Sequence, residues 1–262
     1  AFVLCHELVH FTERHVINAY VQNEELKRGA AEYKRGSFDE GMLAKSGYSK
    51  DFEKEADRLG LKRFLDTQYS SETVSNVFDV MRYAHLPFDD IAFEKEFFDQ
   101  AYYRMDDSYF LNQVRPVEAN ENENPESDTH PSPTERQQLI GRYINNGEPR
   151  ANTSNHLISE ERFKALRNSC RFELSNLYLK SNQPVLSIYN SYLLRKSFPE
   201  NPFLQKNIAK ALYTLSKFKT GGNYGYVHPG FSHIEGESQQ LYHLFYRLQP
   251  EELCILATGF IW

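Results

Sequence analysis

The sequence predicts a mainly α-helical protein, and three observations support this fold class. Side chains of one helical face recur at offsets of three and four from Leu4 to Ala19. Residues suited to begin a helix occur at Ser49 and Ser132, and each precedes a helical pattern. From Ser159 onward the pattern is that of successive helical hairpins.

The first half of the chain contains four expected helices. The first covers residues 1–28, and glycines interrupt the pattern before a second helix at residues 50–65. Two shorter helices are expected at residues 70–84 and 89–105. The acidic segment 118–128 has too few apolar residues to form a core, so it predicts a long loop.

The helix after this loop has a distinct start signal. Ser132 suits the N-cap, Pro133 suits the first helical position, and Glu135 completes a capping box. Beyond it, roughly three helices are expected between Ser159 and Phe218, followed by a glycine-rich loop and two last helices.

The expected domain organisation follows from this pattern. Residues 1–142 form one domain, residues 143–158 a polar linker and residues 159–262 a helical region. In that region Leu177-Tyr178 recurs 35 residues later as Leu212-Tyr213, and the surrounding segment resembles the first helix of a tetratricopeptide repeat. An ordinary helical bundle is the alternative.

Composition and charge exclude several classes of function. Lys and Arg number 30 against 36 Asp and Glu, so the net charge is −6 and no nucleic-acid partner is expected. No apolar run approaches the ~18 residues of a membrane helix, so no transmembrane segment is expected in this chain. The 3 cysteines have no CxxC spacing, which argues against a disulfide framework and a thiolate zinc site.

The residues that indicate chemistry begin with an HExxH motif, His6-Glu7-Leu8-Val9-His10. Positions four apart on a helix differ by only about 40°, so both imidazoles point the same way and can bind one zinc ion. Glu7 lies beside them, where a carboxylate can take a proton from a zinc-activated water. The alternative is a buried helix whose histidines have only structural partners.

A second motif, Glu53-Lys54-Glu55-Ala56-Asp57, lies on a separate predicted helix. Glu53 is the candidate third zinc ligand, and Asp57, one turn later, could orient a ligating imidazole. A solvated helix face is the alternative for Glu53. A metzincin ligand set is excluded, because residue 16 is Val where its third His would stand. His15 is expected to face away from the site as a packing or hydrogen-bonding residue, because it lies about 140° round a continuous helix from His10.

Together these motifs resemble the HtpX-like and CAAX prenyl-protease type of gluzincin metallopeptidases. The similarity comprises residues 6–15, residues 53–60, and a downstream His-Pro motif, Thr129-His130-Pro131-Ser132, with Arg136 following. It implies that His6, His10 and Glu53 bind one zinc ion per chain, that Glu7 is the general base, and that Asp57 supports a ligand. It also implies that His130 faces the substrate carbonyl; a plain loop histidine is the alternative.

The resemblance carries further expectations. It implies the helical part of a zincin catalytic domain, protein or peptide substrates, and a place in the cell envelope, either periplasmic or membrane-associated. Family domains place helix and sheet before HExxH, so we expect this sequence to be N-terminally incomplete. A second hypothesis is a helical protein-binding module with a structural or degenerate zinc site. Glu7 favours the peptidase, because a structural zinc site has no use for an adjacent base.

Overall fold

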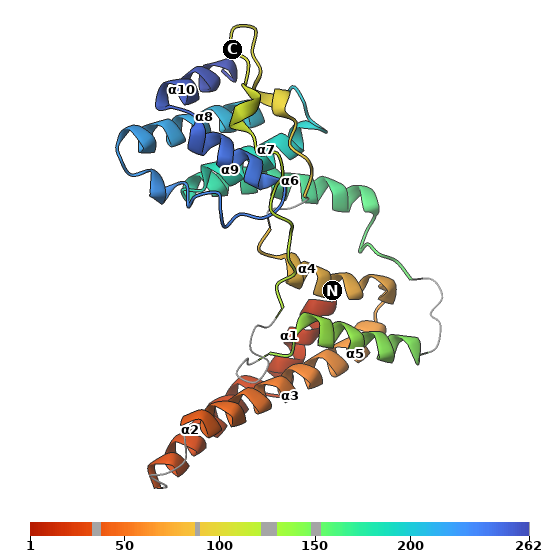
Figure 1. Ribbon diagram of the computed structural model, residues 1–262. Helices are drawn as coiled ribbons and strands as arrows, with labels where there is room; N and C mark the ends of the chain where they lie inside the picture. Colours follow the sequence, from red (N-terminus) through yellow and green to blue (C-terminus); the bar gives the residue numbers. More distant parts are fainter. Residues whose placement is uncertain (33–37, 87–89, 122–129, 148–152, 262) are drawn as a thin grey trace. The chain divides into compact units, whose positions relative to one another are not determined.

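The computed structural model describes most of the chain, namely residues 1–32, 38–86, 90–121, 130–147 and 153–261. It divides into two compact units, which are described separately. The first unit comprises residues 1–84 and 119–160, and the second comprises residues 85–118 and 161–262. Within the described ranges the chain forms helices and two isolated β-bridges but no strand, so the predicted mainly α fold is confirmed (Figure 1).

The first unit consists of helices around a small apolar core. Its helices are α1 (Phe2–Thr12), α2 (His15–Glu32), α3 (Phe38–Leu65), the short 3-10 helix η1 (Ser71–Thr73), α4 (Ser75–Tyr83) and α5 (Pro133–Asn145). The core residues are Phe2, Leu61, Phe64, Val74, Phe78 and Ile140. Fully burying a side chain such as that of Phe78 contributes about 1.5–3 kcal/mol, so α1, α3, α4 and α5 are held together mainly by these contacts.

A glycine allows α1 and α3 to pack closely. A methyl group built on Gly60 of α3 would lie 2.9 Å from both the amide nitrogen and the Cα of His6 on α1. Real Cβ atoms essentially never approach backbone that closely. The separation of the two helices that carry the site therefore depends on the absence of a side chain at residue 60.

The first expected helix is interrupted, and the second is longer than expected. Arg14 has a φ of 56°, in the left-handed region, so α1 ends at Thr12 and α2 starts again at His15. The helix expected at residues 50–65 begins at Phe38, so Gly41 and Gly47 lie within α3. The start of α5 is confirmed: the Ser132 hydroxyl accepts a hydrogen bond from the Glu135 amide at 3.1 Å.

Two expectations fall partly on residues that the structure leaves undescribed. Residues 122–129 of the acidic segment and its flank, including Thr129, lie outside the described part of the chain, as do residues 148–152 of the expected linker. No helix in the described part is both long enough and apolar enough to cross a membrane.

The second unit contains the three helices expected between Ser159 and Phe218 and the two expected after the glycine-rich loop. They are α6 (Glu160–Lys180), α7 (Pro184–Arg195), α8 (Pro202–Thr220), the short η4 (Tyr224–Tyr226), α9 (Ser238–Arg247) and α10 (Pro250–Gly259). The helix α8 packs against both α7 and α10, and Leu212 and Leu215 are fully buried between them. The relation to tetratricopeptide repeats stays a prediction.

The helix expected at residues 89–105 is wrong. The described residues 90–118 mostly have no regular secondary structure, apart from two short 3-10 turns, η2 (Lys95–Phe98) and η3 (Asp107–Tyr109). Their backbone pairs with side chains of the second unit: the Tyr189 hydroxyl accepts from the Ile91 amide at 3.0 Å and donates to the Ile91 carbonyl at 2.9 Å. Tertiary partners therefore replace the local hydrogen bonds of a helix.

Candidate metal centre

Three metal-binding side chains of the first unit converge between α1 and α3. The Nε2 atoms of His6 and His10 lie 3.0 Å apart. The Glu53 carboxylate lies 3.5 Å from His6 Nε2 through Oε2 and 3.4 Å from His10 Nε2 through Oε1. His6 and Glu53 are buried, so the cluster is largely shielded from bulk water. The structure therefore brings a carboxylate of the second motif to the two histidines, as the sequence predicted.

The spacing of these atoms suits one tetrahedral zinc ion. Zinc bonds of about 2.0–2.1 Å at tetrahedral angles separate neighbouring ligand atoms by about 3.3 Å. Here the two Nε2 atoms lie 3.0 Å apart, and each has a Glu53 oxygen close by, Oε2 at 3.5 Å from His6 and Oε1 at 3.4 Å from His10. One ligand atom from each residue lies within 4.8 Å of the other two. Two imidazoles and one carboxylate are also a donor set that catalytic zinc sites use, with the fourth position left open for water. These residues therefore fit zinc in both chemistry and spacing.

Asp57 and Arg136 form a buried pair beneath the cluster. Asp57 Oδ1 lies 3.0 Å from His6 Nδ1, so the carboxylate can hold the histidine nitrogen that faces away from Glu53. Arg136, from α5, donates two hydrogen bonds of 2.8 Å to the Asp57 carboxylate and lies 3.3 Å from Glu53 Oε2. Arg136 thus joins the supporting and the candidate ligand carboxylates.

Arg136 has a role in the structure that its sequence motif did not predict. The sequence feature that could have pointed to Arg136 is its position four residues after the N-cap Ser132 of the His-Pro motif. That position places it in the first turn of α5, and only the packing of α5 on α3 brings its guanidinium to Asp57.

The charges of this cluster shift the pKa values of its members. Burial alone would lower the pKa of His6, but its contacts with Asp57 and Glu53 outweigh this and raise it to about 9. Burial alone would raise the pKa of Glu53, but the contact with His6 and the charge of Arg136 lower it to about 2. Burial lowers the pKa of His10. Without metal, His6 and Glu53 therefore form a charged pair at neutral pH.

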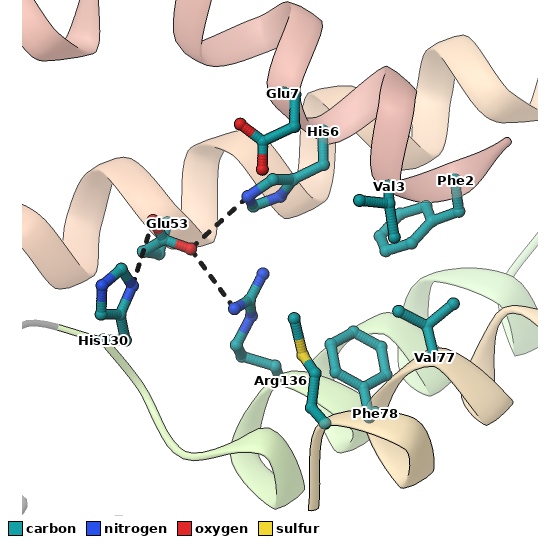
Figure 2. Close-up of a pocket in the computed structure, with 10 residues that line it drawn as sticks. Phe2, Val3, His6, Glu7, Glu53, Val77, Phe78, His130 and Arg136 are labelled. Atoms are coloured by element: carbon teal, nitrogen blue, oxygen red, sulfur yellow. Dashed lines mark ion pairs between the residues drawn. The ribbon is translucent and has the colours of Figure 1, made fainter. Parts of the chain in front are cut away.

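A cavity of about 270 Å³ opens beside the cluster. His6, Glu7, Glu53, His130 and Arg136 form its polar part (Figure 2). The exposed imidazole of His130 places Nδ1 3.2 Å from Glu53 Oε1. The rest of the wall is apolar and consists of Phe2, Val3, Val77, Phe78 and Met81. The structure thus brings the predicted Glu7 and His130 to one cavity with two of the three candidate ligands.

The expectation that His15 faces away from the site is wrong. His15 is buried, and its Nδ1 lies 3.0 Å from Nδ1 of His10. The angle of about 140° holds only for a continuous helix, and the left-handed Arg14 turns the chain before His15. His15 therefore contacts a candidate ligand directly.

Comparison with known families places the cluster in context. The model of peptidase family M48 matches residues 1–144, which include every residue of the cluster and the cavity. The chain matches no curated protein and no solved structure. The family match covers more than half of the chain and agrees with the resemblance drawn from the motifs. This chain belongs to peptidase family M48, a family of zinc-dependent metallopeptidases that act on protein substrates.

Proposed function

We propose that the chain is a zinc metalloendopeptidase in which His6, His10 and Glu53 hold one zinc ion and Glu7 is the general base. The observation that carries this proposal is the convergence of three zinc-type ligand atoms beside a cavity that Glu7 also lines. A purely structural site would need a fourth protein ligand and would have no use for the base.

Bound zinc would lower the pKa of a water molecule and polarise the peptide carbonyl. Glu7 follows His6 on α1, and its exposed carboxylate lines the cavity, where it can take the proton of the attacking water. The same carboxylate then delivers that proton to the leaving amine. Asp57 and Arg136 keep His6 and Glu53 in position during these transfers.

His130 is suited to stabilise the negative charge that develops on the carbonyl oxygen. Its imidazole lines the cavity, and the N-cap of α5 at Ser132 fixes the chain two residues later. A hydrogen-bond donor aimed at such a charge contributes about 2.7–4 kcal/mol to the reaction barrier. The apolar wall of the cavity would accommodate a hydrophobic side chain of the peptide.

The test of the base compares Glu7→Gln with Glu13→Gln, the same chemical change on a side chain outside the cavity. We expect Glu7→Gln to retain one zinc ion per chain by elemental analysis and to lose peptide hydrolysis, while Glu13→Gln retains both. Hydrolysis at the parent rate by Glu7→Gln would refute the assignment of the base.

The test of the metal site measures zinc in the parent and in Glu53→Ala at matched folding, judged by circular dichroism. One zinc ion in the parent and much weaker binding in the variant are expected. A folded parent that binds no zinc would refute the zinc site and favour the helical binding module.

A further inference from the structure

The second candidate histidine ligand has a supporting partner of its own. His10 directs Nε2 toward His6 and Glu53, and its other ring nitrogen, Nδ1, lies 3.0 Å from Nδ1 of His15. His15 Nε2 in turn lies 3.3 Å from Oε2 of Glu55. A chain of contacts therefore runs from the candidate metal position through two imidazoles to a carboxylate.

The carboxylate at the end of this chain determines where the hydrogens lie. An ionised carboxylate only accepts hydrogen bonds, so the hydrogen between His15 and Glu55 belongs to His15 Nε2. A neutral His15 then has a bare Nδ1, which can only accept from His10 Nδ1. In this arrangement His10 carries its hydrogen on Nδ1, which leaves Nε2 with the lone pair that a metal requires.

The ring of His15 is held in this orientation by packing. It stacks on Phe52 with 4.6 Å between ring centroids and an angle of 16° between the planes. Its side chain is only 3% exposed. Phe52 and Glu55 flank Glu53 on α3, so one turn of that helix supplies both the candidate third ligand and the two contacts that hold His15.

We propose that His15 is a positioning residue that holds His10 in the tautomer and ring orientation needed for metal binding, with Glu55 fixing the tautomer of His15. The proposal deepens the zinc site of the proposed function and rests on it. His6 is supported directly by Asp57, whereas His10 is supported by a carboxylate one imidazole further away. Losing such a support usually weakens metal binding about 10–100-fold.

The experiment uses the whole chain and measures its zinc dissociation constant by competition with a chelator. His15→Phe keeps an aromatic ring on Phe52 but offers no acceptor, and we expect its zinc dissociation constant to rise about 10–100-fold. His15→Gln restores an acceptor for His10 Nδ1, and we expect it to recover most of this loss. Glu55→Gln should also raise the zinc dissociation constant, but by less than His15→Phe, because it removes only the group that fixes the tautomer of His15.

Two spectroscopic readouts separate positioning from general damage to the fold. The visible spectrum of the cobalt-substituted chain reports ligand geometry, and we expect it to change in His15→Phe and to return in His15→Gln. The ¹⁵N ring shifts of His10 in the metal-free chain report its tautomer, with hydrogen on Nδ1 in the parent and a mixture in His15→Phe. Glu13→Gln, which leaves His15 untouched, should match the parent throughout.

The outcomes distinguish this proposal from the zinc function itself. A parent that binds no zinc, but whose His10 hydrogen lies on Nδ1 and becomes mixed in His15→Phe, would refute the zinc function and support the control of the His10 tautomer by His15. If His15→Phe had the same zinc affinity, cobalt spectrum and His10 tautomer as the parent, the positioning role would be overturned while the zinc function stands. A parent with neither zinc nor the Nδ1 hydrogen would overturn both.

Discussion

Replacing Gly60 with alanine should separate α1 from α3 and disturb the candidate metal site without touching a ligand. The added Cβ would lie 2.9 Å from the His6 amide nitrogen and Cα and 3.3 Å from the carbonyl carbon of Cys5. All three are backbone atoms, so no flexible side chain can move aside. Ordinary van der Waals contact begins at 3.4 Å, so a local separation of 0.5 Å would restore it.

Two opposing contributions determine the stability of this variant. Alanine is favoured over glycine inside a helix by about 0.5–1 kcal/mol. Overpacking a close contact costs about 1–3 kcal/mol. The net change in the free energy of unfolding is therefore a loss of about 0–2.5 kcal/mol. Metal sites tolerate errors of only about 0.2 Å in ligand distance, so a 0.5 Å shift of His6 should also weaken zinc binding by about tenfold or more.

Gly141 provides a matched control, because it also lies inside a helix of the first unit and has nothing within 4 Å of the position of an added Cβ. Gly141→Ala should gain the helix preference of about 0.5–1 kcal/mol and leave zinc affinity unchanged. Urea denaturation measures the free energy of unfolding, and hydrogen exchange measures the local stability of α1 and α3. Chelator competition measures zinc affinity. Equal stabilisation by both substitutions, with unchanged zinc affinity, would refute the close-packing argument.

Further predictions concern the buried ion pair, the effect of pH and the segment around Ile91. Arg136→Leu should destabilise the first unit by up to about 3–5 kcal/mol, because the buried Asp57 carboxylate loses two hydrogen bonds and the guanidinium charge and keeps only His6 as a cationic partner. Thermal unfolding measures this, and a loss below about 1 kcal/mol would contradict it. The His6 pKa of about 9 exceeds the ordinary 6.5, so its ion pairs stabilise the metal-free chain fully below pH 6.5 and are lost as the pH rises through 9. Zinc must displace that proton, so zinc affinity should rise up to about tenfold per pH unit between pH 6.5 and 9, and a flat titration would contradict it. Tyr189→Phe should remove both hydrogen bonds to Ile91 and cost about 1 kcal/mol, with faster exchange of the Ile91 amide as the measurement; unchanged exchange would show that the tether is unimportant.

Local sequence patterns predicted the parts of the site that depend on one helix. The four-residue spacing of His6 and His10 places both imidazoles on one face of α1, and their Nε2 atoms indeed lie together. Glu53 and Asp57 share a face of α3 in the same way and contact opposite sides of His6. The roles of these residues in zinc binding and catalysis stay predictions.

A local backbone turn and long-range packing determined what the sequence pattern missed. His15 reaches His10 only because the chain leaves the helix at Arg14, and no periodicity argument anticipates a left-handed residue in an otherwise helical stretch. A helix was predicted for the aromatic-rich residues 89–105, yet the Tyr189 and Tyr192 hydroxyls of α7 bind the backbone of residues 91–94 in place of local helical hydrogen bonds.

The sequence by itself determined that this chain is mainly helical and that it carries the three motifs of a zinc metallopeptidase, because helix period, capping and motif spacing are local properties. Only the tertiary structure decided that Arg136 joins Asp57 to Glu53, that Gly60 sets the distance between α1 and α3, and that His15 supports His10. Each of these contacts joins different helices, and their geometry depends on how buried side chains fill the space between them.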